Sequence, residues 1–242
     1  MDYNNYNGYD SYNQNTTQAN YYNSADREDI RSKIFTRTYL IMLASLLVTA
    51  FAATITATVA SPAAFQNLFT PMLIIELVVA IGASAVLSKG NTAVAAVLYA
   101  IYTVVNGVTM AVIFFAYDIA SIQQAFMITA LLFGVMAVIG TITKADLTNL
   151  GAILTMALIG VILVSVVNMI FGYTGMDMAI NYVVVFIFIG LTAYDAQKTK
   201  VLAENATYAD INRCALFSGM QLYLDFINLF LRILAIMGKR RN

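Results

Sequence analysis

The stretch CALFSGMQLYLDFINLFLRILAIMG, residues 214–238, decides the fold, because it is a mainly apolar segment with polar side chains in its middle. The interruptions are Gln221, Asp225, Asn228 and Arg232. In a helix with 100° between residues, these four side chains fall within about 60° of one another, with Ser218 beside them. The stretch is therefore predicted to be a helix with one polar stripe.

The cost of this stripe predicts where the helix lies. An Asp or Arg at the centre of a membrane helix costs about 2.5–3.5 kcal/mol, whereas each Leu, Ile or Phe returns only about 0.3–0.6 kcal/mol. Asp225 and Arg232 together nearly cancel the apolar residues around them. We expect other helices, rather than lipid, to surround this segment.

Six further segments are long and apolar enough to cross roughly 30 Å of hydrocarbon, which takes about 20 residues. They are residues 38–60, 71–88, 92–117, 119–143, 147–171 and 178–197. The composition agrees, with 60% hydrophobic and 11% charged residues and a mean hydropathy of +0.75. The sequence predicts an all-α membrane protein over residues 30–242: a seven-transmembrane-helix bundle in which helices one to six surround a central, polar-striped helix seven.

Residues 1–29 differ from the rest, because they are rich in Tyr and Asn and contain no aliphatic run that could form a core. We predict a disordered tail. Basic residues gather on the cytoplasmic side of membrane proteins, and they flank alternate ends of the predicted helices, which places the N-terminus in the cytoplasm. These residues are Arg27, Arg31, Lys33, Arg37, Lys89, Lys144, Lys198, Lys200 and Arg213. Lys239, Arg240 and Arg241 lie outside if the seventh segment also crosses.

Composition excludes several functions. The 13 basic residues balance the 13 acidic ones, so no basic surface is expected for nucleic acid. The chain has no His, which removes Ser-His and Cys-His catalysis and imidazole metal sites. Its single cysteine, Cys214, excludes an internal disulfide and multi-Cys metal sites. We expect no enzymatic activity and no tightly bound cofactor; the expected partners are the lipid bilayer, ions and a membrane protein.

Glu76 and Arg232 are a candidate ion pair. Each lies about six residues from the predicted outer end of its helix, which places both near a depth of about 9 Å. Pairing would offset the cost of burying either charge alone. Elsewhere in the predicted helices, Asn106 and Asn168 are expected to form hydrogen bonds between helices. Glycines are expected to allow close helix packing: Gly107, Gly134, Gly140, Gly151, Gly160 and Gly190.

Two motifs near the C-terminus resemble a known family. Tyr194-Asp195-Ala196-Gln197 ends the sixth helix, and the run from Leu222 to Leu231 carries Asp225 in the seventh. Together they are similar to the paired signatures of the Bax inhibitor-1 family, also called the transmembrane Bax-inhibitor-motif family. The similarity covers about residues 30–238 and indicates a prokaryotic member, in the bacterial cytoplasmic membrane.

The resemblance implies a pH-sensitive calcium leak channel. In prokaryotic members, a pair of aspartates on helices six and seven controls the leak, and these positions match Asp195 and Asp225. The resemblance also implies a basic latch residue on helix two, for which Lys89 at the inner end is the nearest candidate. Gln221 and Asn228 would support the pair from the same polar stripe.

The chemistry of two carboxylates agrees with such a gate. Two carboxyl groups in a low-dielectric site do not both ionise readily, so the pair would hold one shared proton and titrate in two coupled steps. Loss of the proton at higher pH would separate the helices and leave oxygens for a divalent cation. Calcium takes six to eight oxygens, so Asp195 and Asp225 are expected to bind it weakly.

Other functions compete with this one. An intramembrane aspartyl protease also uses two helix-borne aspartates, but Leu222-Tyr223-Leu224 stands where such enzymes have Gly-x-Gly before the second Asp. A proton-coupled transporter would show internal repeats, and no obvious halves occur. Some bacterial relatives resemble modulators of a membrane-bound ATP-dependent protease, so a regulatory protein that acts through its tail is the alternative.

Overall fold

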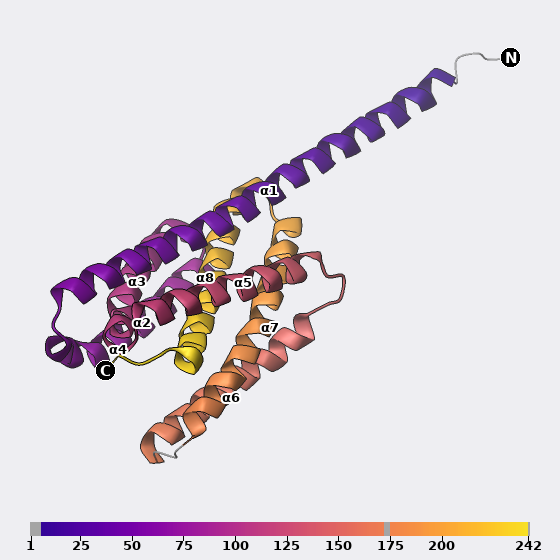
Figure 1. Ribbon diagram of the computed structural model, residues 1–242. Helices are drawn as coiled ribbons and strands as arrows, with labels where there is room; N and C mark the ends of the chain where they lie inside the picture. Colours follow the sequence, from indigo (N-terminus) through magenta and orange to yellow (C-terminus); the bar gives the residue numbers. More distant parts are fainter. Residues whose placement is uncertain (1–5, 172–174, 242) are drawn as a thin grey trace.

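The computed structural model describes the backbone of residues 6–171 and 175–241 (Figure 1). Within these residues the structure consists of α-helices, one short 3-10 turn and no strand beyond an isolated bridge. In chain order the elements are α1 (Tyr6–Val59), α2 (Pro62–Ser88), α3 (Thr92–Met110), α4 (Val112–Ala116), α5 (Ile119–Ile142), α6 (Thr148–Phe171), α7 (Met176–Asn205), η1 (Tyr208–Asp210) and α8 (Ile211–Met237).

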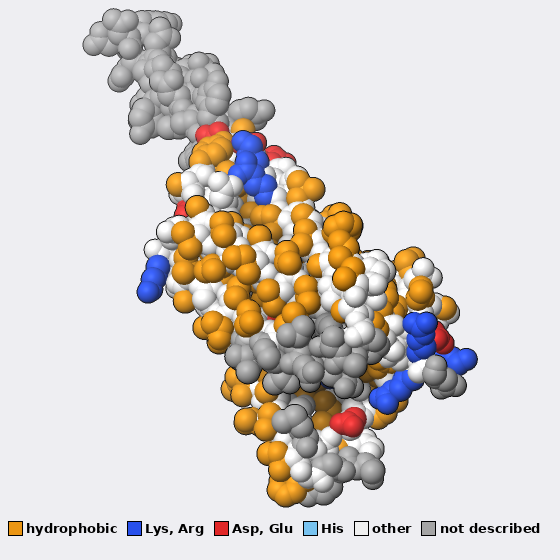
Figure 2. Space-filling model, turned by 90° about the vertical axis from the view of Figure 1, so that its left-hand side faces the viewer, with side chains coloured by type: hydrophobic (Ala, Val, Ile, Leu, Met, Phe, Trp, Pro, Cys, Tyr) orange, Lys and Arg blue, Asp and Glu red, His pale blue; other side chains and the backbone are white. Residues whose placement is uncertain are grey.

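The predicted membrane bundle is confirmed. In the described residues, six helical segments are long and apolar enough to cross a membrane, and α2 adds the shorter apolar segment Val78–Ser88. The six are formed by α1, α3 with α4, α5, α6, α7, and η1 with α8. Figure 2 shows a face that is mostly hydrophobic, with Lys and Arg side chains at its margins. The molecule is therefore a multi-pass all-α membrane protein.

Three helices are longer than predicted: α2 and α7, and α1, whose extension is described below. α2 begins at Pro62 rather than at residue 71, since proline suits the first turn of a helix, where its missing N–H costs nothing. α7 continues past residue 197 to Asn205. Its last turns remain helical because Ala203 packs into a small core with Ile34 and Ile211. These ends of α2 and α7 differ from the prediction because both helices continue beyond the end of the apolar run.

The backbone of α1 continues to Tyr6 and projects beyond the bundle (Figure 1). The extension includes most of the segment for which the sequence predicts a tail. The disordered tail over residues 1–29 stays a prediction, and residues 1–5 lie outside the described part of the chain.

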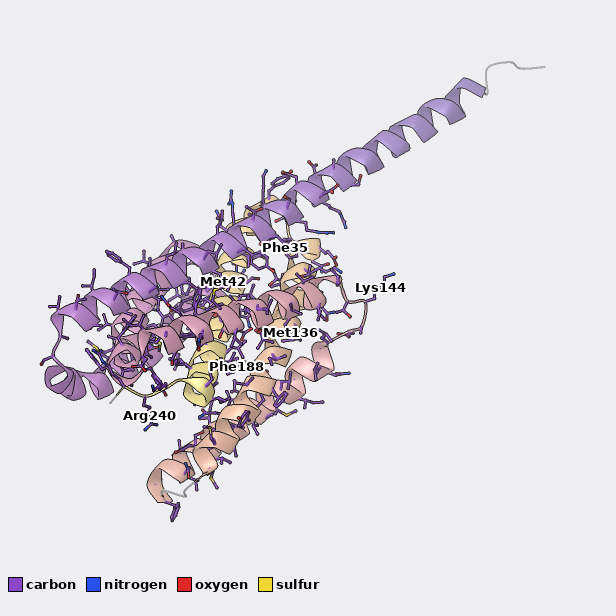
Figure 3. The ribbon with its side chains drawn as sticks, viewed as in Figure 1. Phe35, Met42, Met136, Lys144, Phe188 and Arg240 are labelled. Carbon is purple, nitrogen blue, oxygen red and sulfur yellow. The ribbon has the colours of Figure 1, made fainter. Side chains whose placement is uncertain are left out.

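α8 is the central helix, as predicted from its polar stripe. Helices α1, α2, α3, α5 and α7 all pack against it, and Leu222, Tyr223, Leu229 and Leu234 are fully buried. The surrounding core includes Met42 of α1 and Phe188 of α7 (Figure 3). The arrangement differs from the prediction in one helix: α6 packs on the outer side of α7. α6 has few polar groups to cover and buries only 6% of its most apolar window, so it can face lipid.

The bundle has two chemically distinct ends. At the first, called the basic end, Arg37 of α1 donates a hydrogen bond to Asn212, and Arg213 donates to the carbonyl of Ser88. At the second, called the strap end, residues 239–241 lie against the connection between α4 and α5, where Arg240 forms a bridge with Tyr117. Lys144 and Arg240 lie at opposite ends in Figure 3. α8 therefore runs from the basic end to the strap end.

Candidate functional site

The structure brings together the two aspartates that the sequence singles out. Asp195 of α7 is 7% exposed and Asp225 of α8 is 4% exposed. Their carboxyl groups lie in hydrogen-bonding contact with each other. α7 and α8 pack along their lengths, and each aspartate projects from the face that meets the other helix. The site is a carboxyl pair between two membrane helices.

The hydrogen bonds around the pair are few. Gln221, one turn before Asp225 on α8, donates from Nε2 to Asp195 Oδ1 at 3.3 Å. The Oδ2 atom of Asp225 is buried, and no donor from the described residues reaches it. A proton shared between the two carboxyl groups would provide the missing donor. With both groups ionised, two buried negative charges would face each other.

Lys198 is the basic residue near the pair. It follows Asp195 by about one turn, and its positive charge acts on both carboxyl groups. The Nζ atom lies 4.8 Å from the centre of the Phe217 ring and 5.8 Å from that of Tyr194. The two rings hold the ammonium group at the cytoplasm-facing side predicted for this end. The spacing of three residues between Asp195 and Lys198, about one helical turn, already indicates in the sequence that the two side chains are neighbours at the membrane interface.

The structure does not bring Lys89 to the aspartate pair. Its side chain is exposed in the turn between α2 and α3, and no interaction of Lys89 with either aspartate is found. The latch role of Lys89 stays a prediction, and the cation near the pair, Lys198, lies on the same helix as Asp195.

Asn228 does not support the pair either. Its Nδ2 atom donates to the carbonyl of Leu224 in the same helix, at 2.8 Å. A side chain that bonds one turn back along its own helix needs no partner from a neighbouring helix. The polar stripe therefore supplies Gln221 to the site but not Asn228.

The predicted ion pair between Glu76 and Arg232 is not formed. Arg232 lies seven residues after Asp225, about 10 Å nearer the strap end, where its Nη1 atom donates to Asn181 of α7 at 3.0 Å. Glu76 lies deeper than expected, because α2 begins at Pro62. The wrong helix start placed the two residues at the same depth, and the structure separates them.

Glu76 belongs instead to a buried polar network among α2, α3, α8 and α1. Its Oε1 atom accepts hydrogen bonds from Asn106 and, at 3.3 Å, from the Tyr102 hydroxyl. The Tyr223 hydroxyl donates to Asn106 Oδ1 at 3.0 Å and lies 2.7 Å from the Thr49 hydroxyl. Asn106 thus joins helices, as predicted. Tyr223 is only two residues from Asp225, so α8 carries both the network and the carboxyl pair.

Gln197, the last residue of the sixth-helix motif, holds the loop between α5 and α6. Its Nε2 atom donates to the Ala145 carbonyl at 2.7 Å, and its Oε1 atom accepts from the Leu147 amide at 2.8 Å. In the same exposed loop, the side chain and amide of Thr148 donate to Asp146 and hold the pKa of that carboxyl below its usual value. The motif therefore places Asp195 and anchors a connection at the basic end.

Small residues let α7 approach its neighbours beside the site. A Cβ atom on Gly140 of α5 would collide with the backbone of Ala193. Gly151 of α6 lies against the Tyr194 ring, and Gly190 against Leu154. Close packing is confirmed for these glycines and for Gly107. It is wrong for Gly134 and Gly160, which have nothing within 4 Å of a Cβ position.

The oxygens available for a cation are limited. Asp195 and Asp225 offer carboxylate oxygens, and Gln221 offers an amide oxygen. Across residues 6–171 and 175–241, no group of three or more acidic or Cys side chains is arranged to hold a metal ion. A calcium ion at the pair would complete its six to eight ligands with water and backbone carbonyls.

Comparisons with known proteins agree with this architecture. The family model described as inhibitor of apoptosis-promoting Bax1 matches residues 31–242. The chain is 39% identical to the inner membrane protein YbhL of Escherichia coli K12 over 209 residues, covering 83% of this chain and 88% of that protein. It is 38% identical to a protein of Borreliella burgdorferi over 221 residues, with 88% and 94% covered. A match of this length, with both aspartate motifs at one contact between helices, shows that the chain belongs to the Bax inhibitor-1 family.

Proposed function

We propose that the protein is a pH-sensitive calcium leak channel whose gate is the contact between Asp195 and Asp225. The observation that supports this proposal is the burial of both carboxyl groups against each other, with Asp225 Oδ2 lacking a donor. Such a contact favours a shared proton between α7 and α8. This role requires no catalytic residue and no resident cofactor.

The direction of the pH response follows from the shared proton. At low pH the proton forms a hydrogen bond between the two carboxyl groups and holds α7 against α8. As pH rises the proton leaves, and the two like charges repel across a poorly hydrated contact. The helices separate there, and calcium passes along the newly ionised carboxylates. Lys198 stabilises the ionised form, so it favours opening.

In this proposal the membrane is the bacterial cytoplasmic membrane and the basic end faces the cytoplasm. The orientation follows the tendency of Lys and Arg to remain on the cytoplasmic side. The aspartate pair and the polar network of Glu76 then lie at adjacent positions along α8, since Tyr223 of the network is two residues before Asp225. Calcium would bind the pair weakly, which suits passage.

The test is calcium flux into liposomes that contain the purified full-length chain, measured at several pH values. Wild type should pass calcium with a rate that rises with pH, and Asp195→Asn or Asp225→Asn should abolish that dependence. Asp146→Asn, an exposed carboxyl in the loop between α5 and α6, is the matched control and should behave as wild type. A folded wild-type protein that passes no calcium at any pH would contradict the proposal.

A second candidate function is regulation of a membrane protein partner, such as a membrane-bound ATP-dependent protease. The observation that favours it is the extension of α1 beyond the bundle at the basic end (Figure 1). Deletion of residues 2–25 separates the two functions. A regulator that uses this extension should lose its effect on the partner, whereas a leak through the bundle should remain unchanged.

A further inference from the structure

An apolar groove of about 580 Å³ lies between helices at the strap end, away from the aspartate pair's polar contacts. Helices α1, α4, α5 and α8 contribute its walls, together with the last residue of α3. The side chains on α5 extend from Ile119, in its first turn, to Met127. At 1.5 Å per residue this is a depth of about 12 Å. The groove therefore extends from the strap end well into the hydrocarbon region.

The lining favours a hydrocarbon chain. Only Thr49 and Gln123 are polar among the lining residues, and the Thr49 hydroxyl already bonds to the Thr103 carbonyl and Tyr223. Phe126 and Met127, on the wall formed by α5, are 44% and 68% exposed. The groove thus opens sideways, toward the surface that lipid covers in a membrane. An apolar cavity with such an opening does not favour water.

The strap, residues 239–241, places three cations at the mouth of the groove. Backbone hydrogen bonds join the Asp118 amide to the Lys239 carbonyl at 3.1 Å and the Arg241 amide to the Ala116 carbonyl at 3.0 Å. The Lys239 amide also donates to the Ser121 hydroxyl at 3.0 Å. Ala116, Asp118 and Ser121 lie between Phe114 and Ile122, which line the groove. The strap is therefore attached to the same corner as the groove.

The strap's charges are available to a ligand. The side chains of Lys239, Arg240 and Arg241 are exposed. In the part of the chain that the structure describes, none of them forms an ion pair, because the one ion pair found joins Lys33 to Asp29. Asp118 is the acidic residue of this corner, so cations outnumber it three to one. The mouth of the groove has an excess of positive charge.

We propose that the groove and strap bind an anionic phospholipid, with one acyl chain between α1, α5 and α8 and the phosphate group held by Lys239, Arg240 and Arg241. Cations beside a membrane surface attract anionic lipids, and the apolar groove accepts the chain attached to the phosphate. A zwitterionic lipid would also fit its acyl chain into the groove, but its headgroup would be attracted less strongly to the three cations. Free phosphate would match only the cations. This site goes beyond the proposed leak and does not depend on it.

The absence of Trp from the chain provides a clean test. Met127→Trp introduces one fluorophore at the open side of the groove. Leu163→Trp places the same fluorophore on α6, at a position 62% exposed and remote in sequence from the groove. Each full-length variant is reconstituted in vesicles of phosphatidylcholine and phosphatidylglycerol with matched acyl chains, in which one lipid at a time is brominated. Quenching then reports which lipid lies beside each Trp.

Quenching of Met127→Trp should show that phosphatidylglycerol binds in the groove about tenfold or more tightly than phosphatidylcholine. Each cation near the phosphate increases the affinity for an anionic lipid roughly fivefold. At Leu163→Trp the two lipids should quench about equally. Adding Lys239→Gln, Arg240→Gln and Arg241→Gln to the groove reporter should remove the preference. The matched control removes three charges at the basic end, by Arg27→Gln, Arg31→Gln and Lys144→Gln. It should leave the preference for phosphatidylglycerol unchanged.

A groove variant tests the acyl chain separately. Ala50→Phe fills the groove from an exposed position on α1 and should reduce quenching of the groove Trp by brominated phosphatidylglycerol. Gln123→Trp, also exposed in the groove, is a second reporter if Met127→Trp does not fold. Equal lipid ratios at the groove and α6 reporters would overturn the proposal, since the groove would then hold unselective lipid. Full displacement by soluble glycerol phosphate would also overturn it.

Discussion

Asp225 lies against Asp195 at the centre of the molecule, and its Oδ2 atom is buried without a hydrogen-bond donor from the described residues. Two facing carboxyl groups need either a shared proton or a cation. Gln221 donates to Asp195, so it does not provide the donor that Asp225 Oδ2 lacks. The contact between α7 and α8 is therefore stable when the two carboxyl groups share a proton, and it is destabilised when both are ionised.

Asp225→Asn should weaken the dependence of the fold's stability on pH. The Asn amide donates to Asp195 as the shared proton does, but it does not titrate, so Asp195 is left as the one titrating group of the pair. In wild type that hydrogen bond is present at low pH and lost as pH rises, so wild type should lose about 1–3 kcal/mol toward high pH. Thermal unfolding in detergent, followed by circular dichroism from about pH 5 to pH 9, measures both proteins. Parallel pH curves would contradict the shared proton.

Lys198→Gln should move the pH response of calcium flux upward. The Lys198 charge favours ionised carboxylates at the pair, so its removal lets the pair retain its proton to higher pH. Lys200→Gln, two residues further along α7, removes the same charge from a residue for which no interaction with the pair is found. Flux measured against pH in liposomes should give a raised midpoint for the first variant alone. An unchanged midpoint would mean that Lys198 is screened from the pair.

Tyr223→Phe should destabilise the bundle by about 1–3 kcal/mol, because it leaves buried groups of the Glu76 network without a partner. The lost hydroxyl is bonded to Asn106 and Thr49. Tyr182→Phe is the matched control, since Tyr182 is 51% exposed on α7. Thermal unfolding of the three proteins at one pH measures the difference. Equal unfolding temperatures would show that the network contributes no net stability.

The membrane bundle and the aspartate pair were predictable because they depend on patterns within single helices. An apolar run of about 20 residues determines a span, and the helical period places Asp225 and Gln221 on the same stripe. The polar stripe also predicted a central α8. These features can be predicted without knowing how neighbouring helices are shifted along their axes relative to one another.

The errors arose where depth between helices mattered. Glu76 and Arg232 were paired because α2 was expected to begin at residue 71, and its start at Pro62 moves Glu76 deeper. Asn228 was assigned to the site from its position on the stripe, but its hydrogen bond is to its own helix. The place of α6 outside α7 was also not readable, because its uniformly apolar surface has no face that marks a neighbour.

Gly140→Ala should weaken the contact of α5 with α7, whereas Gly134→Ala should not. An added methyl group at Gly140 meets the backbone of Ala193, which cannot yield as a flexible side chain does. At Gly134 the same methyl group meets nothing within 4 Å, and alanine favours the helix by roughly 0.5–1 kcal/mol. The thermal unfolding temperature should therefore fall by several degrees for Gly140→Ala. For Gly134→Ala it should stay equal to that of wild type or rise.

The same pair of variants tests how α5 supports the site. Ala193 is two residues before Asp195, so a displacement of α7 at Gly140 should also alter the contact between the aspartates. Flux through the Gly140→Ala protein should lose part of its dependence on pH, while Gly134→Ala retains it. If both variants unfold at the wild-type temperature, α5 and α7 do not approach as closely in the membrane as they do in this structure.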